Sequence, residues 1–193
     1  MAESEGKRES SAQPAQAGAA LAWRSSQSWS LLLSTFILGV TADLVSKSWV
    51  FATLLARPDH VIDVIPGVLR LSLSTNPGIV FGIRAPWPLV MVATAAALIV
   101  VMYLFTGSPR KAWPLHVALG MVLAGAVGNA YDRLFSFVRM PGRAEDAVGQ
   151  VRDFIDVYAV NYPIFNVADI LLVLGVVIIL FSLGGMKPKP TAK

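Results

Sequence analysis

Four long apolar stretches, separated by polar segments, dominate the pattern of this chain. They run from about Ser30 to Leu55, Trp87 to Phe105, Trp113 to Phe135 and Val167 to Leu183. Because a helix rises about 1.5 Å per residue, roughly 20 apolar residues cross the hydrocarbon core of a bilayer. The third stretch is rich in Gly and Ala, which favours close packing between helices. The pattern therefore predicts a polytopic α-helical membrane protein built as a bundle of four transmembrane helices.

The two polar segments on one side of these spans differ in character. Residues 61–73 alternate loosely between apolar and polar positions and carry Val, Ile and Leu on either side of a Pro-Gly turn signal. That pattern is typical of β-structure, so we expect a small β-sheet or hairpin lying on the membrane surface. Residues 136–150, which contain a Pro-Gly pair and a further Gly, are typical of a loop.

The ends of the chain differ from its centre. Residues 1–28 are polar and rich in Ala, Ser and Gln, a composition that cannot bury a core, so we expect a disordered tail. Residues 29–185 form the membrane domain, and 186–193 form a short basic tail. Basic residues before the first span, between the second and third, and after the fourth predict that both termini are cytoplasmic. These residues are Lys7, Arg8, Arg24, Arg110, Lys111, Lys187, Lys189 and Lys193.

Composition supports the membrane assignment and excludes several kinds of site. Of the 193 residues, 55% are hydrophobic and 15% are charged, which is too apolar for an ordinary soluble domain. There is no Cys, so disulfides, thiolate metal sites and a Cys nucleophile are excluded. His60 and His116 lie far apart and match no zinc-ligand spacing. The net charge of +4 forms no continuous patch, so we expect no nucleic-acid partner, no metal and no cofactor.

The unusual polar residues all fall at one depth, near the outer ends of the predicted spans. Several pairs share a helical face because they are three or four residues apart. Ionisable groups inside a membrane are costly and are functional candidates by default. The set comprises Asp43, Lys47, Asn76, Asn129, Asp132, Arg133, Asp153, Asn166 and Asp169.

Each member also has a structural explanation. Asp43 and Lys47 are compatible with a buried ion pair, and Asn129 with Arg133 is compatible with a capped helix end whose Arg extends to the interface. Asn166 fits a helix N-cap, a role compatible with a functional one. The collection of the whole set at one depth is what favours a functional site. Asp156 stands outside this set, and we expect it to be a solvated loop charge.

Two carboxylates at a membrane surface suggest a specific chemistry. When two such groups lie close together they cannot both ionise easily, so their pKa values separate and one proton is shared. One carboxylate can then take a proton from water while the other donates to a substrate carbonyl, as in aspartic peptidases. That chemistry requires no metal, Ser or Cys. The chain lacks a G-x-S-x-G element, a P-loop and a dinucleotide Gly pattern.

Five short elements contain the unusual polar residues. They are Asp43 to Lys47, Asn76 to Phe81, Gly128 to Arg133, Val151 to Ile155 and Phe165 to Asp169. Together they resemble the bacterial lipoprotein signal peptidase family, signal peptidase II. The family pattern begins with an Asp and a Lys in the first span and continues with Asn-x-Gly-x-x-Phe, Gly-Asn-x-x-Asp-Arg, Val-x-Asp-Phe-Ile and Phe-Asn-x-Ala-Asp. All five occur here in the family order.

The resemblance implies an aspartic peptidase with four membrane helices and an extracytoplasmic β-sheet cradle in the bacterial inner membrane. Its implied substrate is a prolipoprotein that is cleaved just before a diacylglyceryl-modified cysteine, and its implied surroundings are membrane lipid. We expect it to be a monomer. By resemblance the catalytic pair is Asp153 and Asp169, and Asp132 helps to hold Arg133 and Asn129. The residues that shape and polarise the site are Asp43, Lys47, Asn76, Gly78, Asn129, Asp132, Arg133, Asn166 and Ala168.

The chain departs from the family pattern in three places. The gap from Asp132 to Asp153 is longer than usual, and the extra residues within 137–149 predict a larger surface loop, which either gates lipid access or is inert. Pro77 stands where a small or polar residue is usual, and the N-terminal tail is longer. If the alignment around Asp153 is shifted, Asp132 and Asp156 are the alternative partners of Asp169.

Two other classes of function are compatible with intramembrane carboxylates. A proton-coupled transporter uses them as relays, but transport needs polar groups throughout the membrane. The second span has only Thr94 and Tyr103 as polar side chains between Val90 and Phe105, and no inverted repeat is visible. A non-catalytic scaffold leaves the outer polar cluster unexplained.

Overall fold

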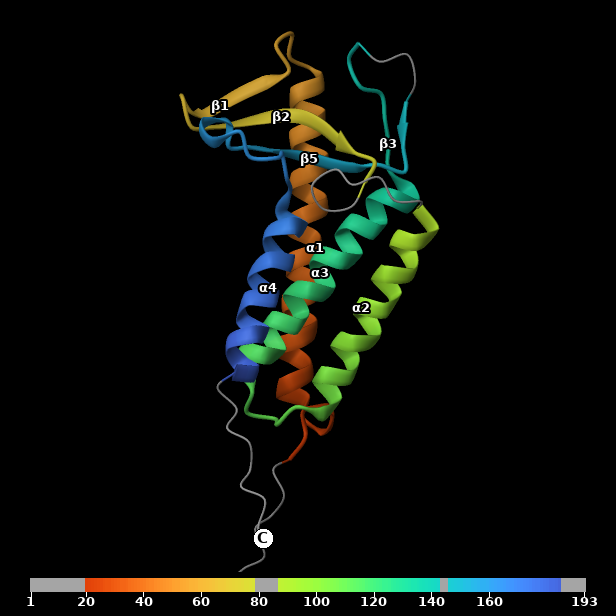
Figure 1. The fold of residues 1–193 in the computed structure, drawn as a ribbon, viewed down its shortest axis with the longest axis vertical. Coiled ribbons are helices and arrows are strands. Elements are labelled where there is room, and N and C mark those ends of the chain that lie inside the picture. Colours follow the sequence, from red (N-terminus) through yellow and green to blue (C-terminus); the bar gives the residue numbers. More distant parts are fainter. Residues whose placement is uncertain (1–19, 79–86, 143–145, 185–193) are drawn as a thin grey trace, which may run out of the picture.

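The predicted bundle is present in the computed structural model, which describes residues 20–78, 87–142 and 146–184. Four of the described helices are long and apolar enough to cross a membrane. Their bounds are Ser26–Leu55 for α1, Trp87–Gly107 for α2, Trp113–Phe135 for α3 and Val167–Gly184 for α4. The four predicted spans are confirmed. Figure 1 shows α3 between the other helices, with α1 extending beyond them at one end.

The ordered fold begins earlier than the sequence analysis expected. A short 3-10 helix, η1, occupies Ala22–Arg24, and α1 begins at Ser26 because the Ser25 hydroxyl accepts a hydrogen bond from the Ser28 amide at 3.3 Å. Residues 22–28 therefore belong to the membrane domain and not to the tail. The remaining expectations for residues 1–19 and 186–193 lie outside the described residues.

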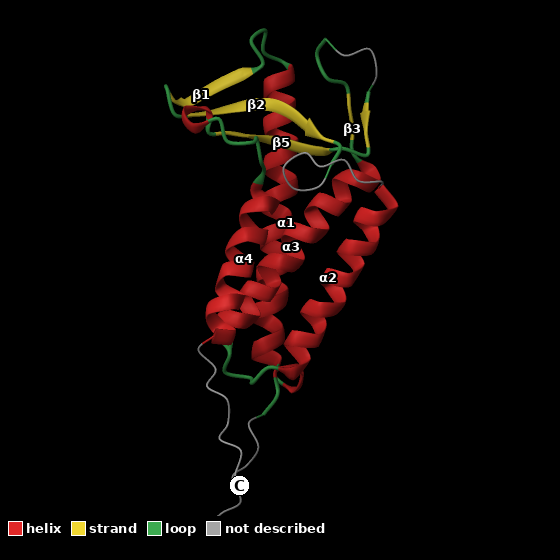
Figure 2. Ribbon diagram, viewed as in Figure 1, coloured by secondary structure: helices red, strands yellow, loops and turns green. Residues whose placement is uncertain are grey.

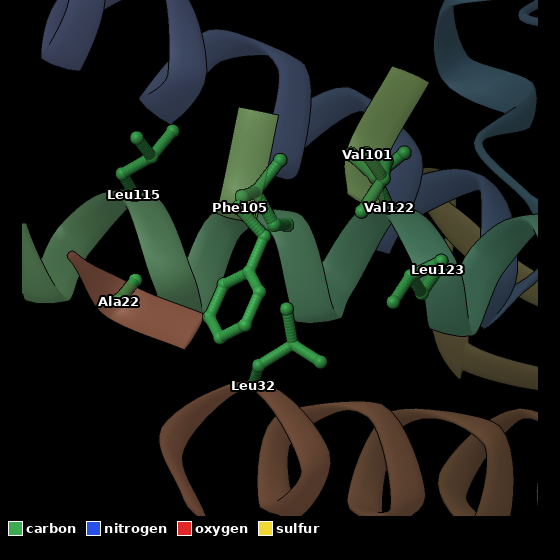
Figure 3. Close-up of a cluster of buried hydrophobic side chains, with 8 residues drawn as sticks. Ala22, Leu32, Val101, Phe105, Leu115, Val122 and Leu123 are labelled. Carbon is green, nitrogen blue, oxygen red and sulfur yellow. The ribbon is translucent and has the colours of Figure 1, made fainter. Parts of the chain in front are cut away.

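The end of the bundle farthest from the sheet is held by an apolar cluster (Figure 3). Phe105 of α2 is fully buried against Leu32 of α1 and Leu119 of α3. The backbone of η1 adds hydrogen bonds to the α2–α3 connection, from the Ala22 amide to the Ser108 carbonyl at 2.9 Å. Apolar contacts thereby join α1, α2 and α3 at this end. The polar residues of the predicted site lie toward the opposite end.

Helix α3 approaches both α1 and α4 closely because small residues line its surfaces. A β-carbon on Gly120 would lie 2.7 Å from the Leu32 carbonyl oxygen of α1, and one on Gly125 would lie 2.5 Å from the Ala168 carbonyl oxygen of α4. Only glycine permits such approach of backbones. The Gly/Ala-rich third span thus packs closely against α1 near the end farthest from the sheet and against the first turn of α4.

A three-stranded antiparallel sheet covers the end of the bundle that was predicted to be the outer one (Figures 1 and 2). Its order is β1-β2-β5, and its third strand comes from the segment after α3. The strands are Val61–Ile65 for β1, Leu69–Asn76 for β2 and Val151–Asp156 for β5. The predicted sheet is confirmed. In the register of β2 with β5, Ser74 pairs with Asp153. Figure 1 shows β5 as the strand nearest the helices, so the Asp153 carboxylate comes from the edge of the sheet next to the bundle.

Residues 136–150 are not simply a loop, as the sequence analysis expected. They contain a short antiparallel hairpin in which β3, Phe137–Val138, pairs with β4, Ala147–Val148. Val138 and Ala147 are buried with Phe51 and Leu54 of α1. This second apolar cluster fixes the hairpin and the sheet on the outer part of α1.

Candidate active site

The first turn of α4 is organised by a reciprocal pair of hydrogen bonds. The Asn166 side-chain oxygen accepts from the Asp169 amide at 3.0 Å, and the Asp169 carboxylate accepts from the Asn166 amide at 3.0 Å. This is a capping box, in which residues three apart satisfy the free amides that begin a helix. The N-cap interpretation of Asn166 is confirmed, and Asp169 is held at the start of the span.

The same asparagine connects Asp169 to Asp153. The buried Asn166 side-chain amide donates to the Asp153 carboxylate at 2.6 Å while its own carbonyl oxygen serves the helix cap. One residue thus binds both carboxylates of the sequence prediction, Asp153 on β5 through its side chain and Asp169 on α4 through its backbone amide.

Asp153 lies in a setting that favours its protonated form. Its exposed fraction is 3%. Burial, and then the negative charge of Asp169, raise the pKa of Asp153 from 3.8 to about 7, while hydrogen bonds from Asn166 and Asn76 and the charge of Lys47 act in the opposite direction. Removing a carboxylate from water disfavours its charged form, and a like charge nearby adds to that cost. Near neutral pH this group can therefore carry a proton and donate it.

Asp169 has a different environment. One of its oxygens accepts from the Asn129 side-chain amide at 2.9 Å and the other accepts from the Asn166 backbone. Each oxygen therefore has one donor directed at it, an arrangement that matches a carboxylate. The two acidic groups differ in what surrounds them, as an acid and a base acting together would require.

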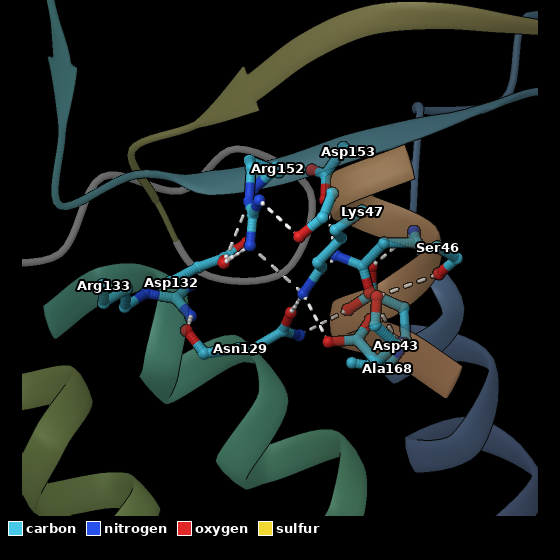
Figure 4. A network of polar contacts seen from close by, with 12 residues as sticks. Asp43, Ser46, Lys47, Asn129, Asp132, Arg133, Arg152, Asp153 and Ala168 are labelled. Carbon is cyan, nitrogen blue, oxygen red and sulfur yellow. Dashed lines mark hydrogen bonds and ion pairs between the residues drawn. The ribbon is translucent and has the colours of Figure 1, made fainter. Parts of the chain in front are cut away.

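Lys47 supplies a buried positive charge, which lies below Asp153 in the view of Figure 4. Its ammonium lies 2.7 Å from Asp43, 3.0 Å from the Asn129 side-chain oxygen and 3.4 Å from Asp132. The side chains of Lys47, Asp43 and Asp132 are fully buried. The ammonium donates hydrogen bonds to Asp43 and Asn129, and Asp132 adds a second ion pair. The Asn129 amide is also oriented by Lys47, so that its nitrogen faces Asp169.

Asp43 joins the first span to the last. Its second carboxylate oxygen accepts from the Ala168 backbone amide at 2.9 Å, in the first turn of α4. Negative charge is favourable at a helix N-terminus. The approach requires Gly128 of α3, because a β-carbon there would lie 2.4 Å from the Asp43 carboxylate. The structural interpretation of the Asp43–Lys47 pair is therefore correct, and it places both residues directly under the candidate dyad.

Asp132 does not act as the sequence analysis expected. It was expected to hold Arg133 and Asn129, but its carboxylate accepts instead from Arg152. The Arg152 guanidinium donates to one oxygen at 2.7 and 3.1 Å, and the Arg152 backbone amide donates to the other at 2.9 Å. Together with Lys47, these contacts give two buried carboxylates and two cations in one network. The strand that carries Asp153 is thereby fixed to the end of α3.

Arg133 holds a different element. Its guanidinium donates to the Gly78 carbonyl at 2.7 Å and to the Asn129 carbonyl at 3.2 Å. The Asn76 side chain accepts from the Gly78 amide at 2.8 Å, which forms a tight turn around Pro77. The element after β2 is therefore fastened to α3 beside the two aspartates. Pro77 does not prevent this turn, since the hydrogen bond spans it.

Asp156 is buried, which corrects the expectation of a solvated loop charge. It ends β5, and its carboxylate accepts from the Arg70 guanidinium at 2.6 Å and from the Ser72 hydroxyl at 3.3 Å. Both alternative partners of Asp169 are thus occupied elsewhere, Asp132 by Arg152 and Asp156 by Arg70. Arg152 and Gly128 are the site residues that the sequence analysis did not select. The sequence signal for Arg152 was its position beside Asp153.

A cavity of about 410 Å³ connects the two aspartates to the membrane-spanning part of the bundle. Its outer end is polar and contains the candidate dyad with Arg133. The rest is mainly apolar and lies between α2, α3 and α4. The polar lining residues are Asn76, Asn129, Arg133, Asp153 and Asp169, and the lining residues within the helices include Val90, Ala93, Thr94, Ala97, Ala126, Leu172 and Val173.

Comparison with known proteins assigns this arrangement to a family. A sequence model described as signal peptidase (SPase) II matches residues 35–184, which include all five motifs. The chain belongs to the signal peptidase II family. It is therefore a multi-pass membrane aspartic peptidase of the class that removes signal peptides from prolipoproteins, and the transporter and scaffold alternatives are set aside.

Individual relatives agree with the signal peptidase II assignment. The chain is 37% identical over 163 residues to a lipoprotein signal peptidase of Streptomyces griseus, covering 83% of this chain and 76% of the relative. It is 36% identical over 159 residues to one from Symbiobacterium thermophilum, covering 81% and 95%. A solved structure described as a bacterial membrane enzyme is similar with a TM-score of 0.67 and 29% identity, covering 84% of this chain and 94% of that one.

Proposed function

We propose that this protein cleaves diacylglyceryl-modified prolipoproteins just before the lipidated cysteine, with Asp153 and Asp169 as the catalytic dyad. The observation that carries the proposal is the position of Asn166. It contacts both carboxylates at the polar end of an otherwise apolar cavity. An aspartic peptidase needs two acidic groups that share one proton, and this pair has the required asymmetry.

The proposed reaction follows from the protonation of the pair. Asp169 takes a proton from a water molecule, whose oxygen attacks the scissile carbonyl carbon, while protonated Asp153 gives its proton to the carbonyl oxygen. The resulting tetrahedral diol collapses when the carbon–nitrogen bond breaks. The proton that Asp169 gained passes to the leaving amine, and a diol hydroxyl returns a proton to Asp153. Both groups end in their starting states, so the cycle consumes only water.

The shape of the cavity supports a lipid-modified substrate. Its apolar wall is formed by α2, α3 and α4 within the membrane-spanning region, whereas the dyad lies at the polar end beside the sheet. A diacylglyceryl group remains in the bilayer, so the peptide bond next to it stays near the headgroups. A dyad at this depth meets that bond without drawing the lipid into water.

The supporting residues have distinct proposed roles. Lys47 orients the Asn129 amide toward Asp169, and Asp43 anchors the first turn of α4 through Ala168. Asn129, Asn166 and Asn76 offer amides to the dyad and its substrate. The remaining supporting residues shape the wall of the site on the side of the sheet. They are Gly78, Asp132 and Arg133.

We propose that both termini are cytoplasmic and that the site faces the extracytoplasmic side. The 3-10 helix η1, which contains Arg24, and the α2–α3 connection, which contains Arg110 and Lys111, lie at the end of the bundle opposite the sheet (Figure 1). Basic residues of inner-membrane proteins are concentrated on the cytoplasmic side. The chain has no cysteine, so a thiol reagent labels only a cysteine that is introduced by substitution. In intact cells an impermeant maleimide should label Asp59→Cys and not Lys111→Cys, and the reverse pattern would contradict the orientation.

The proposed activity is tested by incubating purified protein with a diacylated lipobox peptide. Wild type should release the signal peptide, and globomycin should inhibit the release. Asp153→Asn and Asp169→Asn should each abolish cleavage. Asp59→Asn is the matched control, because Asp59 lies in an exposed ion pair with Arg57 outside the site. Normal turnover by either dyad variant, with its thermal unfolding midpoint unchanged, would refute the assignment.

A further inference from the structure

The β3–β4 hairpin has two apolar faces, although only one of them packs against the protein. Val138 and Ala147 form the inward pair, with exposed fractions of 9% and 2%, within the cluster around α1. Phe137 and Val148 form the outward pair, with exposed fractions of 67% and 63%. A hairpin with one face in water ordinarily alternates apolar inside and polar outside. This outward face therefore belongs against something apolar.

The outward pair continues the lipid-facing surface of α3. Tyr131, Leu134 and Phe135 near the end of that helix are exposed, and the rings of Tyr131 and Phe135 contact each other in a tilted arrangement with centroids 5.1 Å apart. Phe137 follows the helix by only two residues, and the intervening Ser136 is buried, so the exposed apolar residues at the end of the span are followed directly by those of the hairpin. Aromatic residues collect where hydrocarbon meets headgroups.

The hairpin becomes charged immediately beyond this pair. Arg139 and Asp146 form an ion pair of 3.6 Å whose side chains are 79% and 30% exposed. Phe137 and Arg139 are two residues apart, which spans about 7 Å along a strand. The change from an exposed phenyl ring to an exposed ion pair over this distance marks the level at which lipid gives way to water.

We infer that the β3–β4 hairpin is an interfacial anchor, whose outward Phe137–Val148 pair inserts between phospholipids of the outer leaflet. Its inward side packs with Phe154, the neighbour of Asp153 on β5. The anchor thereby sets the depth of the strand that carries Asp153. The longer segment between α3 and β5 is thus a contact with bulk lipid, not a substrate gate.

The test uses the natural absence of cysteine from the chain. Four single variants, Phe137→Cys, Val148→Cys, Arg139→Cys and Asp146→Cys, are labelled with an environment-sensitive fluorophore. Each full-length protein is then reconstituted in phosphatidylcholine–phosphatidylglycerol vesicles. Two quenchers are applied, aqueous iodide and a phospholipid carrying a nitroxide high on its acyl chain. All four residues are at least partly exposed, so the fold should tolerate each substitution.

The anchor predicts a clear division between the two pairs. Labels at 137 and 148 should be quenched by the lipid nitroxide and have iodide quenching constants about threefold below those at 139 and 146, as interfacial burial requires. Equal iodide quenching at all four positions would overturn the inference. Shielding of 137 and 148 from both quenchers would also overturn it, because protein and not lipid would then cover the face. Neither readout depends on peptidase activity, so the proposed function stands or fails separately.

Discussion

Arg152 holds Asp132 with both its guanidinium and its backbone amide, so one carboxylate fixes a side chain and a strand together. Asp132 lies in the last turn of α3, and Arg152 immediately precedes Asp153 in β5. The position of Asp153 relative to α4 therefore depends on an ion pair that does not itself touch the dyad.

Replacing Arg152 with Met should lower both stability and turnover. The buried Asp132 would keep Lys47 but lose its closest cation, and breaking one side of a buried pair costs about 3–5 kcal/mol. We expect kcat to fall at least about tenfold because the strand loses its anchor, with Arg152→Lys recovering part of the loss. The measurements are thermal unfolding in detergent and peptide cleavage kinetics.

Arg57→Met is the matched control for that change. The Arg57–Asp59 pair has side chains 47% and 58% exposed, and exposed ion pairs contribute little because water and salt screen them. Arg57→Met should leave kcat and the unfolding midpoint essentially unchanged. Similar losses of kcat and stability in Arg57→Met and Arg152→Met would show that the effect does not depend on burial of the Asp132–Arg152 ion pair.

Cleavage should decline as pH rises through about 7. The pKa of Asp153 is raised to about 7, so its protonated, proton-donating form predominates below that pH and disappears above it. The pH dependence of kcat for a diacylated peptide checks this. A rate that is constant from pH 6 to pH 9 would exclude Asp153 as the proton donor.

The same shift predicts a pH-dependent stability difference. The folded pKa of this acid lies above its unfolded value of 3.8, so the folded state binds the proton more tightly. Stability is therefore lost as pH rises from about 4 to about 7. Asp153→Asn removes the ionisation, and its advantage over wild type should grow across that window to at most about 4 kcal/mol. Thermal unfolding of both proteins between pH 4 and pH 8 measures the difference.

Asn166 caps α4 and donates a hydrogen bond to Asp153, and two different substitutions separate these roles. Serine also caps helices, so Asn166→Ser should keep the first turn of α4 while losing the hydrogen bond to Asp153. Asn166→Ala should lose both and cost about 1 kcal/mol more in stability. Both variants should cleave poorly, whereas only the alanine variant should unfold at lower temperature. Full activity in Asn166→Ser would mean that its contact with Asp153 is dispensable.

Gly128→Ala should disrupt the site through a single methyl group. The new β-carbon would lie 2.4 Å from the Asp43 carboxylate, which cannot move freely because Lys47 and the Ala168 amide hold it. We expect a loss of about 1–3 kcal/mol, typical of overpacking. Gly107→Ala is the control, since its β-carbon would meet nothing within 4 Å. Equal unfolding midpoints in the two variants would contradict the predicted clash.

The four spans and the sheet were predictable because their signals are local. Membrane helices require long apolar runs, and the strands of a half-exposed sheet alternate apolar and polar residues. The pairing of β2 with β5 was less accessible, because it joins segments separated by two helices. The β3–β4 hairpin was missed because two-residue strands leave no readable alternation.

The structure brings the residues of the family motifs close together, but the motifs did not predict which residues contact one another. Asp132 and Arg133 are adjacent in sequence but serve different partners, Arg152 and Gly78, since neighbours on a helix point in different directions. The Asp156 expectation failed because Arg70 reaches it across the β2–β5 pairing. Sequence position alone does not reveal such partners.

The bond between Asp43 and the Ala168 amide joins positions separated by 125 residues. During synthesis the first span must wait for the last one before this contact can form. A chain that contains only the first three spans has Asp43 and Lys47 but lacks Asp169. Under the proposed assignment of Asp169, the site is therefore completed only when the fourth span packs against the other three.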